Sequence, residues 1–414
     1  MRAVANERDS TRYVQLDGLR GIAALLVVFS HITVAFRPQM YFGIEKSAAP
    51  TLQSWFATSP LFISVNGSFA VYIFFVLSGF VISASADRTR SSLPATAVAR
   101  FIRLSLPCAA SLIFAGALIN LGLTSASAAI DLVGHWWIKQ LVGFDHPAPW
   151  SGILKDALGW YYVTGLSNFN GVIWTMRREL LGSLAIYLVF APIRRSGWRG
   201  AAEILIFCGV LYANLEPFYY VCFVAGSLLY LTRGAIARTP SFIGGAALLA
   251  GAIIGGKPFF TPPAGTFYDC PYRLASFLHG EMYIWPVGAM LVVFGVLVWR
   301  PAVRLFGNRA ARFMGRVSFA VYLVHFPLLG SVMTFLFVRW GHLSDGAFLA
   351  TVLVYLLVVY TIGYGFTILV DEPATRLSAW LKQSPWPISP WRKDVLPDSV
   401  AQLPRAAGDG KRPQ

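Results

Sequence analysis

Long apolar runs separated by shorter polar segments dominate this sequence of 414 residues. A helix that spans a membrane needs about 20 mostly apolar residues, and ten runs approach or exceed that length. In chain order they cover residues 16–36, 61–83, 104–123, 172–193, 201–214, 218–232, 241–256, 281–299, 317–338 and 346–370. The pattern therefore predicts an all-α fold, a polytopic membrane protein of about ten transmembrane helices.

The composition supports this reading. Charged residues make up 13% of the chain and apolar residues 56%, whereas an average soluble domain has about 25% charged residues. So few charges cannot cover the surface of a soluble globule of this size. The composition therefore excludes an ordinary soluble enzyme and a disordered protein.

The formal net charge of +15 is explained by topology. With the N-terminus inside, 24 of the 34 Lys and Arg residues fall in inner segments and seven in outer loops. Cytoplasmic loops of membrane proteins carry this excess of positive charge. The sequence thus predicts a multi-pass protein of the cell membrane (inner or plasma membrane), surrounded by lipid, with both termini cytoplasmic and no nucleic-acid partner.

Two segments outside the spans have a composition of their own. Residues 124–171 form a long outer stretch rich in aromatic residues, which fits either an interfacial aromatic belt or a platform for sugar rings. After residue 376 the chain is rich in proline and polar residues, a composition typical of disorder. The predicted division is a transmembrane domain over 1–376 and a disordered cytoplasmic tail over 377–414.

Ionisable residues inside spans are costly and mark functional sites. In the first span, Arg20 and His31 are eleven residues apart. They fall on nearly the same helix face, about 16 Å apart along the axis. One interpretation is an anchoring arginine plus a packed histidine. The other is an elongated ligand, such as coenzyme A, with its anionic end on Arg20 and its reactive end at His31.

Two further arginines stand at the start of the third span. Arg100 and Arg103 are spaced i, i+3 and share a helix face. They either anchor the helix at the cytoplasmic rim or clamp anionic phosphates, which the planar guanidinium suits.

The fourth and ninth spans each carry one more candidate. Counted from the predicted ends of the spans, Glu179 and His31 lie at similar depth, so Glu179 is expected to orient His31 and favour its charged form. A local ion pair of Glu179 with Arg177 or Arg178 is the alternative. His325 either lines the same cavity or makes a hydrogen bond near Pro327. No metal-binding or nucleotide-loop motif is present, so no metal is expected.

Several of these segments, in order, resemble the acyltransferase 3 family of integral membrane O-acyltransferases. The resemblance runs from LDGLRGIAALLVVFSH at 16–31 to Asp-Glu-Pro at 371–373, and FFVLSGFVIS at 74–83 is similar to the family's second helix. The family's motif residues correspond to Arg20 and His31, Arg100 and Arg103, Trp174, Thr175 and Glu179, and Gly315, Arg316, Ser318, Phe319, Tyr322 and His325. The Arg177–Arg178 pair departs from the family pattern.

The resemblance implies an O-acyltransferase that moves an acyl group, usually acetyl, from cytoplasmic acyl-CoA to a carbohydrate hydroxyl. Arg20, Arg100 and Arg103 would then hold the donor phosphates. His31 would act as general base or transient acyl carrier, with Glu179 as its partner. Trp174 would shape the wall of the site, supported by Tyr322 and His325.

Two other functions are also compatible with the sequence. A transporter or flippase for an anionic or glycolipid substrate also needs intramembrane Arg, Glu and His residues, although the sequence has no evident internal repeat. A membrane sensor with an inactive site is the third. The acyl group, the acceptor and the oligomeric state do not follow from the sequence.

Overall fold

The computed structural model describes residues 13–43, 52–89, 91–193, 216–260, 262, 264–277 and 283–383, and within these residues it is helical, with no strand. The longer helices are α1 (Val14–Phe36), α4 (Gly67–Arg88), α5 (Leu93–Asn120), α9 (Trp174–Ile193), α11 (Pro217–Leu231), α13 (Ser241–Gly255), α15 (Ile284–Val298), α17 (Arg309–Leu328), α19 (Asp345–Phe366) and α20 (Glu372–Gln383). Short helices and turns connect them: α2 (Pro38–Phe42), α3 (Leu52–Ala57), η1 (Pro60–Val65), α6 (Ala126–Val133), η2 (Trp136–Asp145), α7 (Trp150–Ala157), α8 (Tyr161–Thr164), η3 (Gly171–Ile173), α12 (Arg233–Ile236), α14 (Asp269–Phe277), α16 (Arg300–Gly307), η5 (Leu329–Met333), α18 (Thr334–Leu336), η6 (Phe337–Gly341) and η7 (Thr367–Asp371).

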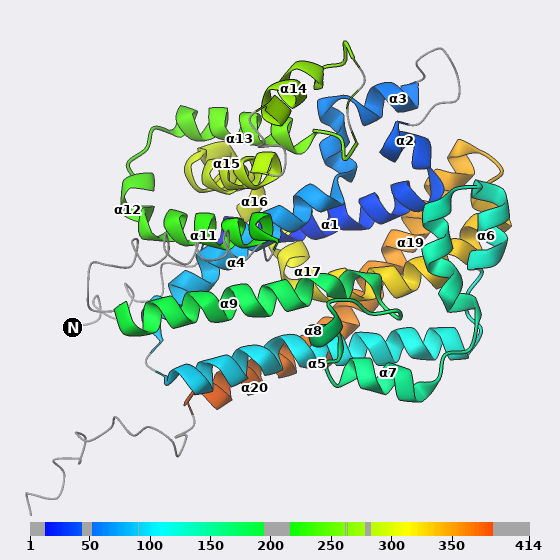
Figure 1. The fold of residues 1–414 in the computed structure, drawn as a ribbon, viewed down its shortest axis with the longest axis horizontal. Helices are drawn as coiled ribbons and strands as arrows, with labels where there is room; N and C mark the ends of the chain where they lie inside the picture. Colours follow the sequence, from blue (N-terminus) through cyan, green and yellow to red (C-terminus); the bar gives the residue numbers. More distant parts are fainter. Residues whose placement is uncertain are drawn as a thin grey trace, which may run out of the picture.

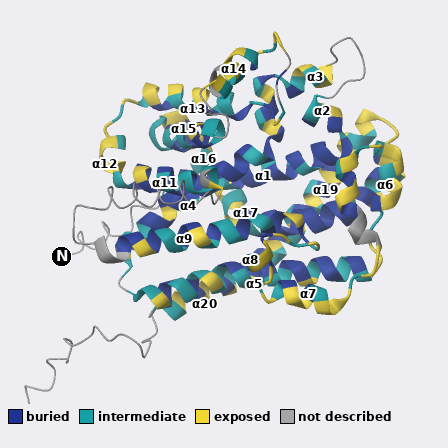
Figure 2. Cartoon of the chain, viewed as in Figure 1, coloured by how far each residue is buried: buried dark blue, intermediate teal, exposed yellow. Residues whose placement is uncertain are grey.

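Helices α1, α4 and α17 form the centre of the bundle. Helix α1 packs against α17 and α4, and α4 packs in turn against α9 and α11; α1, α4, α9 and α5 follow one another across the view in Figure 1. Buried residues concentrate in α1, α4 and α17, while α6, α7 and α12 show more exposed positions (Figure 2). Apolar side chains cover much of the outward surface of α19, as expected for a helix that faces lipid.

The all-α membrane architecture predicted from the apolar runs is confirmed. Within the described residues, five helices are long and apolar enough to cross a membrane, or six if the bent pair α15–α16 is one span. The predicted spans 218–232 and 241–256 correspond to shorter apolar helices. The predicted span 172–193 is helix α9, which carries three charged residues, and the predicted span 201–214 lies outside the described residues.

Two predicted span boundaries are wrong because capping residues set them. The second span begins at Gly67 rather than 61, since the Asn66 side chain accepts a hydrogen bond from the Phe69 N–H and caps the helix. The third helix begins at Leu93 rather than 104, where Ser92 caps the N-terminus and a proline follows inside the first turn. Arg100 and Arg103 therefore lie within a helix, beyond its first turn.

The predicted tail also begins too early. Residues 377–383 belong to α20, which packs along α5. The hydroxyl of Ser378 donates to the carbonyl of Ala99, and that of Ser91 donates to the carbonyl of Lys382. These bonds to α5 and to the residue just before its N-cap hold the segment in a helix that its polar composition did not suggest. Residues 384–414 of the predicted tail lie outside the described residues.

Close packing of glycines sets the register between α1 and α17. A Cβ atom at Gly21 would lie 2.6 Å from the backbone nitrogen of Gly315, and one at Gly315 would lie 2.1 Å from the carbonyl oxygen of Asp17. Small residues allow such close helix contacts in membranes. The two helices run parallel, so the residues ten positions beyond Gly21 and Gly315, His31 and His325, reach the same level.

This contact predicts a stability effect with a matched control. Gly315→Ala is expected to destabilise the protein by about 1–3 kcal/mol, the usual cost of overpacking, because its new methyl group meets backbone that cannot move away. Gly365→Ala is expected to keep stability or raise it by up to about 1 kcal/mol, since nothing lies within 4 Å of a Cβ at that helical position. Thermal unfolding in detergent measures both; equal midpoints for the two variants would contradict the assigned packing.

Candidate active site

A cavity of about 200 Å³ lies between α1, α4, α5, α9 and α17. Its ionisable lining residues are Arg20, Arg100, Arg103, Glu179 and Tyr322. Most of the other lining side chains are apolar. Residues about 300 positions apart in the sequence thus line the same cavity. The three arginines predicted to bind the donor are among them.

Arg100 is held by partners on two other helices. Its guanidinium forms an ion pair with Glu179, and its Nε donates to the Ser183 hydroxyl at 2.9 Å. The Ser78 hydroxyl of α4 donates to the same Glu179 oxygen at 2.7 Å. This network fixes the direction of the Arg100 guanidinium before any ligand arrives.

Arg103 has a carboxylate partner that the sequence did not reveal. Its Nη1 lies 2.5 Å from Oδ1 of Asp371, and its guanidinium lies over the Phe319 ring at 5.4 Å. Asp371 stands at the end of η7, a π-helical turn after α19, and its side chain is only 9% exposed. The acidic residue at the end of the last span is therefore part of the charge arrangement beside the cavity.

Arg20 differs from the other two arginines. It lines the cavity, but within the part of the chain that the structure describes it makes no hydrogen bond or ion pair. Its guanidinium has five N–H donors. The cavity therefore holds one arginine whose donors are available to an anionic ligand.

The Arg100–Glu179 pair predicts a coupled effect on stability. Arg100→Ala is expected to destabilise the protein by about 3–5 kcal/mol, because it leaves the carboxylate of Glu179 buried without its cation. Adding Glu179→Gln to that variant is expected to restore much of the loss, since the buried carboxylate that lost its partner is then neutral. Thermal midpoints of the single and double variants measure this coupling; a double variant less stable than Arg100→Ala alone would contradict it.

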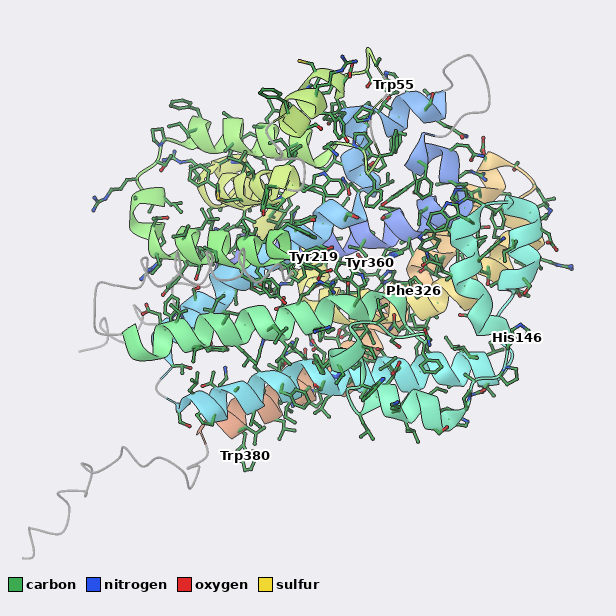
Figure 3. All side chains as sticks on the ribbon, viewed as in Figure 1. Trp55, His146, Tyr219, Phe326, Tyr360 and Trp380 are labelled. Atoms are coloured by element: carbon green, nitrogen blue, oxygen red, sulfur yellow. The ribbon has the colours of Figure 1, made fainter. Side chains whose placement is uncertain are left out.

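The second part of the site is a pair of histidines. Nε2 of His325 lies 3.1 Å from Nδ1 of His31, and the two ring centroids are 5.1 Å apart. His325 is fully buried, while His31 is partly exposed. Phe326 meets the His31 ring edge to face at 5.4 Å, and Trp137 of η2 lies 5.8 Å from it. Figure 3 labels Phe326 near the middle of the bundle.

The hydrogen bonds select one tautomer for each ring when both are neutral. Nδ1 of His325 lies 3.1 Å from the carbonyl of Val321, which can only accept, so Nδ1 carries the proton and Nε2 is an acceptor. Nδ1 of His31 faces that acceptor and the carbonyl of Val27 at 3.0 Å, so it must donate. The remaining nitrogen, Nε2 of His31, then has a lone pair with no hydrogen bond to a described residue. It is the free base of the site.

The structure does not place Glu179 beside His31, and this correction has a geometrical cause. The hydroxyls of Thr175 and Tyr322 lie 2.9 Å apart, so α9 begins level with Tyr322, inside the bundle. Along α17, His325 lies three residues beyond Tyr322. Along α9, Glu179 lies four residues beyond Thr175 in the opposite direction. At 1.5 Å per residue, Glu179 and the histidine pair are therefore about 10 Å apart along the bundle. The prediction assumed that both spans began at the membrane edge. His325 stands where Glu179 was expected.

Trp174 also faces another part of the protein. It does not line the cavity; its ring packs on Tyr219 at 5.4 Å and under the Arg178 guanidinium at 4.6 Å. Arg178 forms an ion pair with Glu216, so the local pair of Arg178 with Glu179 is not formed. The neighbouring residue Thr175 lines the cavity instead.

Three residues of the site were not predicted from the sequence to belong to it. Ser78 lies in the FFVLSGFVIS segment and Asp371 in the Asp-Glu-Pro segment of the family resemblance, but neither residue was given a role there. Trp137 lies in an aromatic stretch that also fits a membrane interface. Among the described residues, no three His, Cys, Asp or Glu side chains are arranged to hold a metal ion.

Comparison with known proteins gives a consistent family assignment. A model of the acyltransferase 3 family, described as an acyltransferase domain, matches residues 13–369. Acyltransferase clz18 of Cochliobolus lunatus is 22% identical over 82% of this chain and 88% of its own length. O-acetyltransferase PaAT-1 of Phomopsis amygdali is 26% identical over 81% and 74%, and acyltransferase MdmB of Streptomyces mycarofaciens is 27% identical over 80% of both chains. No solved structure matches.

Proposed function

This chain belongs to the acyltransferase 3 family, and from that premise we propose that it moves an acetyl group from cytoplasmic acetyl-CoA to a hydroxyl of a carbohydrate. The acceptor would be a surface or exported polysaccharide. The name of the Phomopsis relative, an O-acetyltransferase, supports acetyl as the group and oxygen as the acceptor atom. The protein is an acyltransferase with several helices long and apolar enough to cross a membrane.

The arginine-lined cavity supports an anionic donor. Guanidinium groups bind phosphate oxygens with two parallel hydrogen bonds, and no described residue accepts a hydrogen bond from Arg20. Arg100 and Arg103 are oriented by Glu179 and Asp371. In the proposed arrangement the phosphates of the donor lie at Arg20, Arg100 and Arg103, and its pantetheine arm extends along α1 toward His31.

The histidine pair supports base catalysis. Nε2 of His31 takes the proton of the acceptor hydroxyl as its oxygen attacks the thioester carbon. The new C–O bond forms, the C–S bond breaks, and the proton passes to the leaving thiolate, so that the products are the ester and coenzyme A. The bond from Nδ1 of His31 to His325 keeps the ring in the tautomer that this step needs. A transient acyl group on His31 is the alternative route.

One observation carries the proposal: Arg20 of the cavity and His31 of the histidine pair lie on the same helix, eleven residues apart. That spacing is about 16 Å and separates an anion-binding end from a basic end. A long donor with charge at one end and a thioester at the other fits this division.

The test is the acyl content of the host's surface glycan, measured by NMR as alkali-labile esters. Three strains are compared: wild type, a deletion of this protein, and the deletion complemented with His31→Ala. The proposal predicts that the ester signals disappear on deletion and stay absent with His31→Ala. Glycan that keeps its esters but falls in amount at the surface would favour transport, and no change at all would exclude this acceptor.

A further inference from the structure

Tyr322 occupies the position between the cavity and the histidine pair. It lines the cavity, and its ring centroid lies 5.9 Å from that of His325 on the same helix. His31 and His325 do not line the cavity. A thioester that passes from the arginines to His31 therefore meets the Tyr322 side chain on the way.

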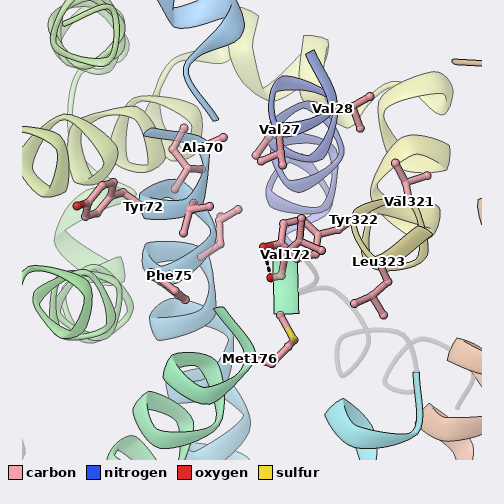
Figure 4. Packing of buried hydrophobic residues seen from close by; sticks show 14 of the residues in the cluster. Val27, Val28, Ala70, Tyr72, Phe75, Val172, Met176, Val321, Tyr322 and Leu323 are labelled. Carbon is pink, nitrogen blue, oxygen red and sulfur yellow. Dashed lines mark hydrogen bonds between the residues drawn. The ribbon is translucent and has the colours of Figure 1, made fainter. Parts of the chain in front are cut away.

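The hydroxyl of Tyr322 is held in a triangle of hydrogen-bonding groups. It lies 2.9 Å from the Thr175 hydroxyl and 3.0 Å from the carbonyl of Val172, a bond drawn in Figure 4. The Thr175 hydroxyl lies 3.1 Å from the same carbonyl. The hydroxyl groups of Tyr322 and Thr175 thus have two protons for three hydrogen-bonding contacts. The Tyr322 proton is free to turn toward a new acceptor while Thr175 still satisfies the carbonyl or donates to Tyr322.

The other hydroxyl groups of the cavity are less suited to this role. The Ser78 hydroxyl donates to Glu179, and the Ser318 hydroxyl donates to the carbonyl of Gly315 within its own helix. The Tyr322 ring is restrained by Phe74, which meets it edge to face at 5.8 Å. Its hydroxyl is therefore a directed donor close to the basic end of the site.

We propose that the Tyr322 hydroxyl donates a hydrogen bond to the carbonyl oxygen of the donor thioester, with Thr175 as its positioning residue; the proposal rests on the proposed function. When the acceptor oxygen attacks the carbonyl carbon, the π electron pair moves onto the carbonyl oxygen. The Tyr322 proton stays on Tyr322 and stabilises that oxyanion. The pair returns as the C–S bond breaks, and His31 handles the proton of the acceptor.

Tyr322→Phe tests this, because phenylalanine keeps the ring and removes only the donor. Loss of one oxyanion donor lowers kcat by about 10²- to 10³-fold, with the KM for acetyl-CoA expected to change less than threefold. Thr175→Val is expected to lower kcat by a smaller factor, Thr175→Ser to retain it, and the double variant to match Tyr322→Phe. Tyr230→Phe is the matched control, since it removes a buried tyrosine bond to Asp87 outside the site.

The outcomes separate this inference from the function on which it rests. An unchanged kcat in Tyr322→Phe, or a raised KM with unchanged kcat, would overturn the role of Tyr322 while wild-type turnover still supports the acyltransferase. Absence of turnover in the wild type would overturn the proposed function itself. If Tyr322→Phe does not fold, the Thr175 pair decides: equal kcat in Thr175→Val and Thr175→Ser would overturn the inference.

Discussion

Replacing His31 with alanine is expected to lower kcat for acyl transfer by about 10²- to 10⁴-fold, the usual contribution of a positioned base. The structure gives the reason, since Nε2 of His31 is the one histidine nitrogen of the pair whose lone pair no described group engages. The KM for acetyl-CoA is expected to stay nearly constant, because Arg20, which would bind the donor phosphates, lies about 16 Å away along α1.

His342→Ala is the matched control for this variant. Its ring, like that of His31, is bonded through Nδ1 to a backbone carbonyl, but it lies at the end of η6 outside the histidine pair. It is expected to retain wild-type turnover. Purified enzyme with radiolabelled acetyl-CoA measures both; His31→Ala with more than a tenth of wild-type kcat would remove the base from the mechanism.

Replacing Arg20 with glutamine is expected to raise the KM for acetyl-CoA by about 10- to 100-fold, the worth of a charge-assisted hydrogen bond. Stability is expected to fall less than in Arg100→Ala, because Arg20 makes no hydrogen bond or ion pair with a described residue and loses only its longer-range attraction to Asp17 and Glu179. This separates Arg20 from Arg100 and Arg103, whose removal also leaves a carboxylate without its partner.

Arg177→Gln serves as the control for Arg20→Gln. Arg177 stands on α9 but does not line the cavity, and its guanidinium only approaches the carbonyl of Val163 at 3.5 Å. Donor titrations on the two variants, followed by initial rates, give the comparison. An unchanged KM in Arg20→Gln, or an equal rise in both variants, would mean that Arg20 merely anchors the helix.

Sequence periodicity was sufficient to predict features that lie within a single helix. The eleven-residue spacing placed Arg20 and His31 on one side of α1, and the i, i+3 spacing did the same for Arg100 and Arg103. The long apolar runs likewise gave the all-α membrane fold. These are properties of a single helix, so they do not depend on how helices meet.

The predictions that were wrong depend on how neighbouring helices are positioned relative to one another along their axes. The sequence does not show that α9 begins inside the bundle beside Tyr322, and this displaced Glu179 and Trp174 from their expected roles. The contact of His31 with His325 depends on Gly21 and Gly315, whose close approach sets the register between α1 and α17. Asp371 was hidden because its partner, Arg103, lies 268 residues away.

The most direct test of the whole account is transfer of label from radioactive acetyl-CoA by the protein in lipid nanodiscs. Membranes of the deletion strain supply the acceptor, and the product is counted as alkali-labile ester. The account predicts ester formation by the wild type, a rate for His31→Ala that stays about 10²- to 10⁴-fold lower at any donor concentration, and recovery of Arg20→Gln at high donor concentration. Ester formation by His31→Ala at more than a tenth of the wild-type rate, or donor saturation unaffected by Arg20→Gln, would contradict it.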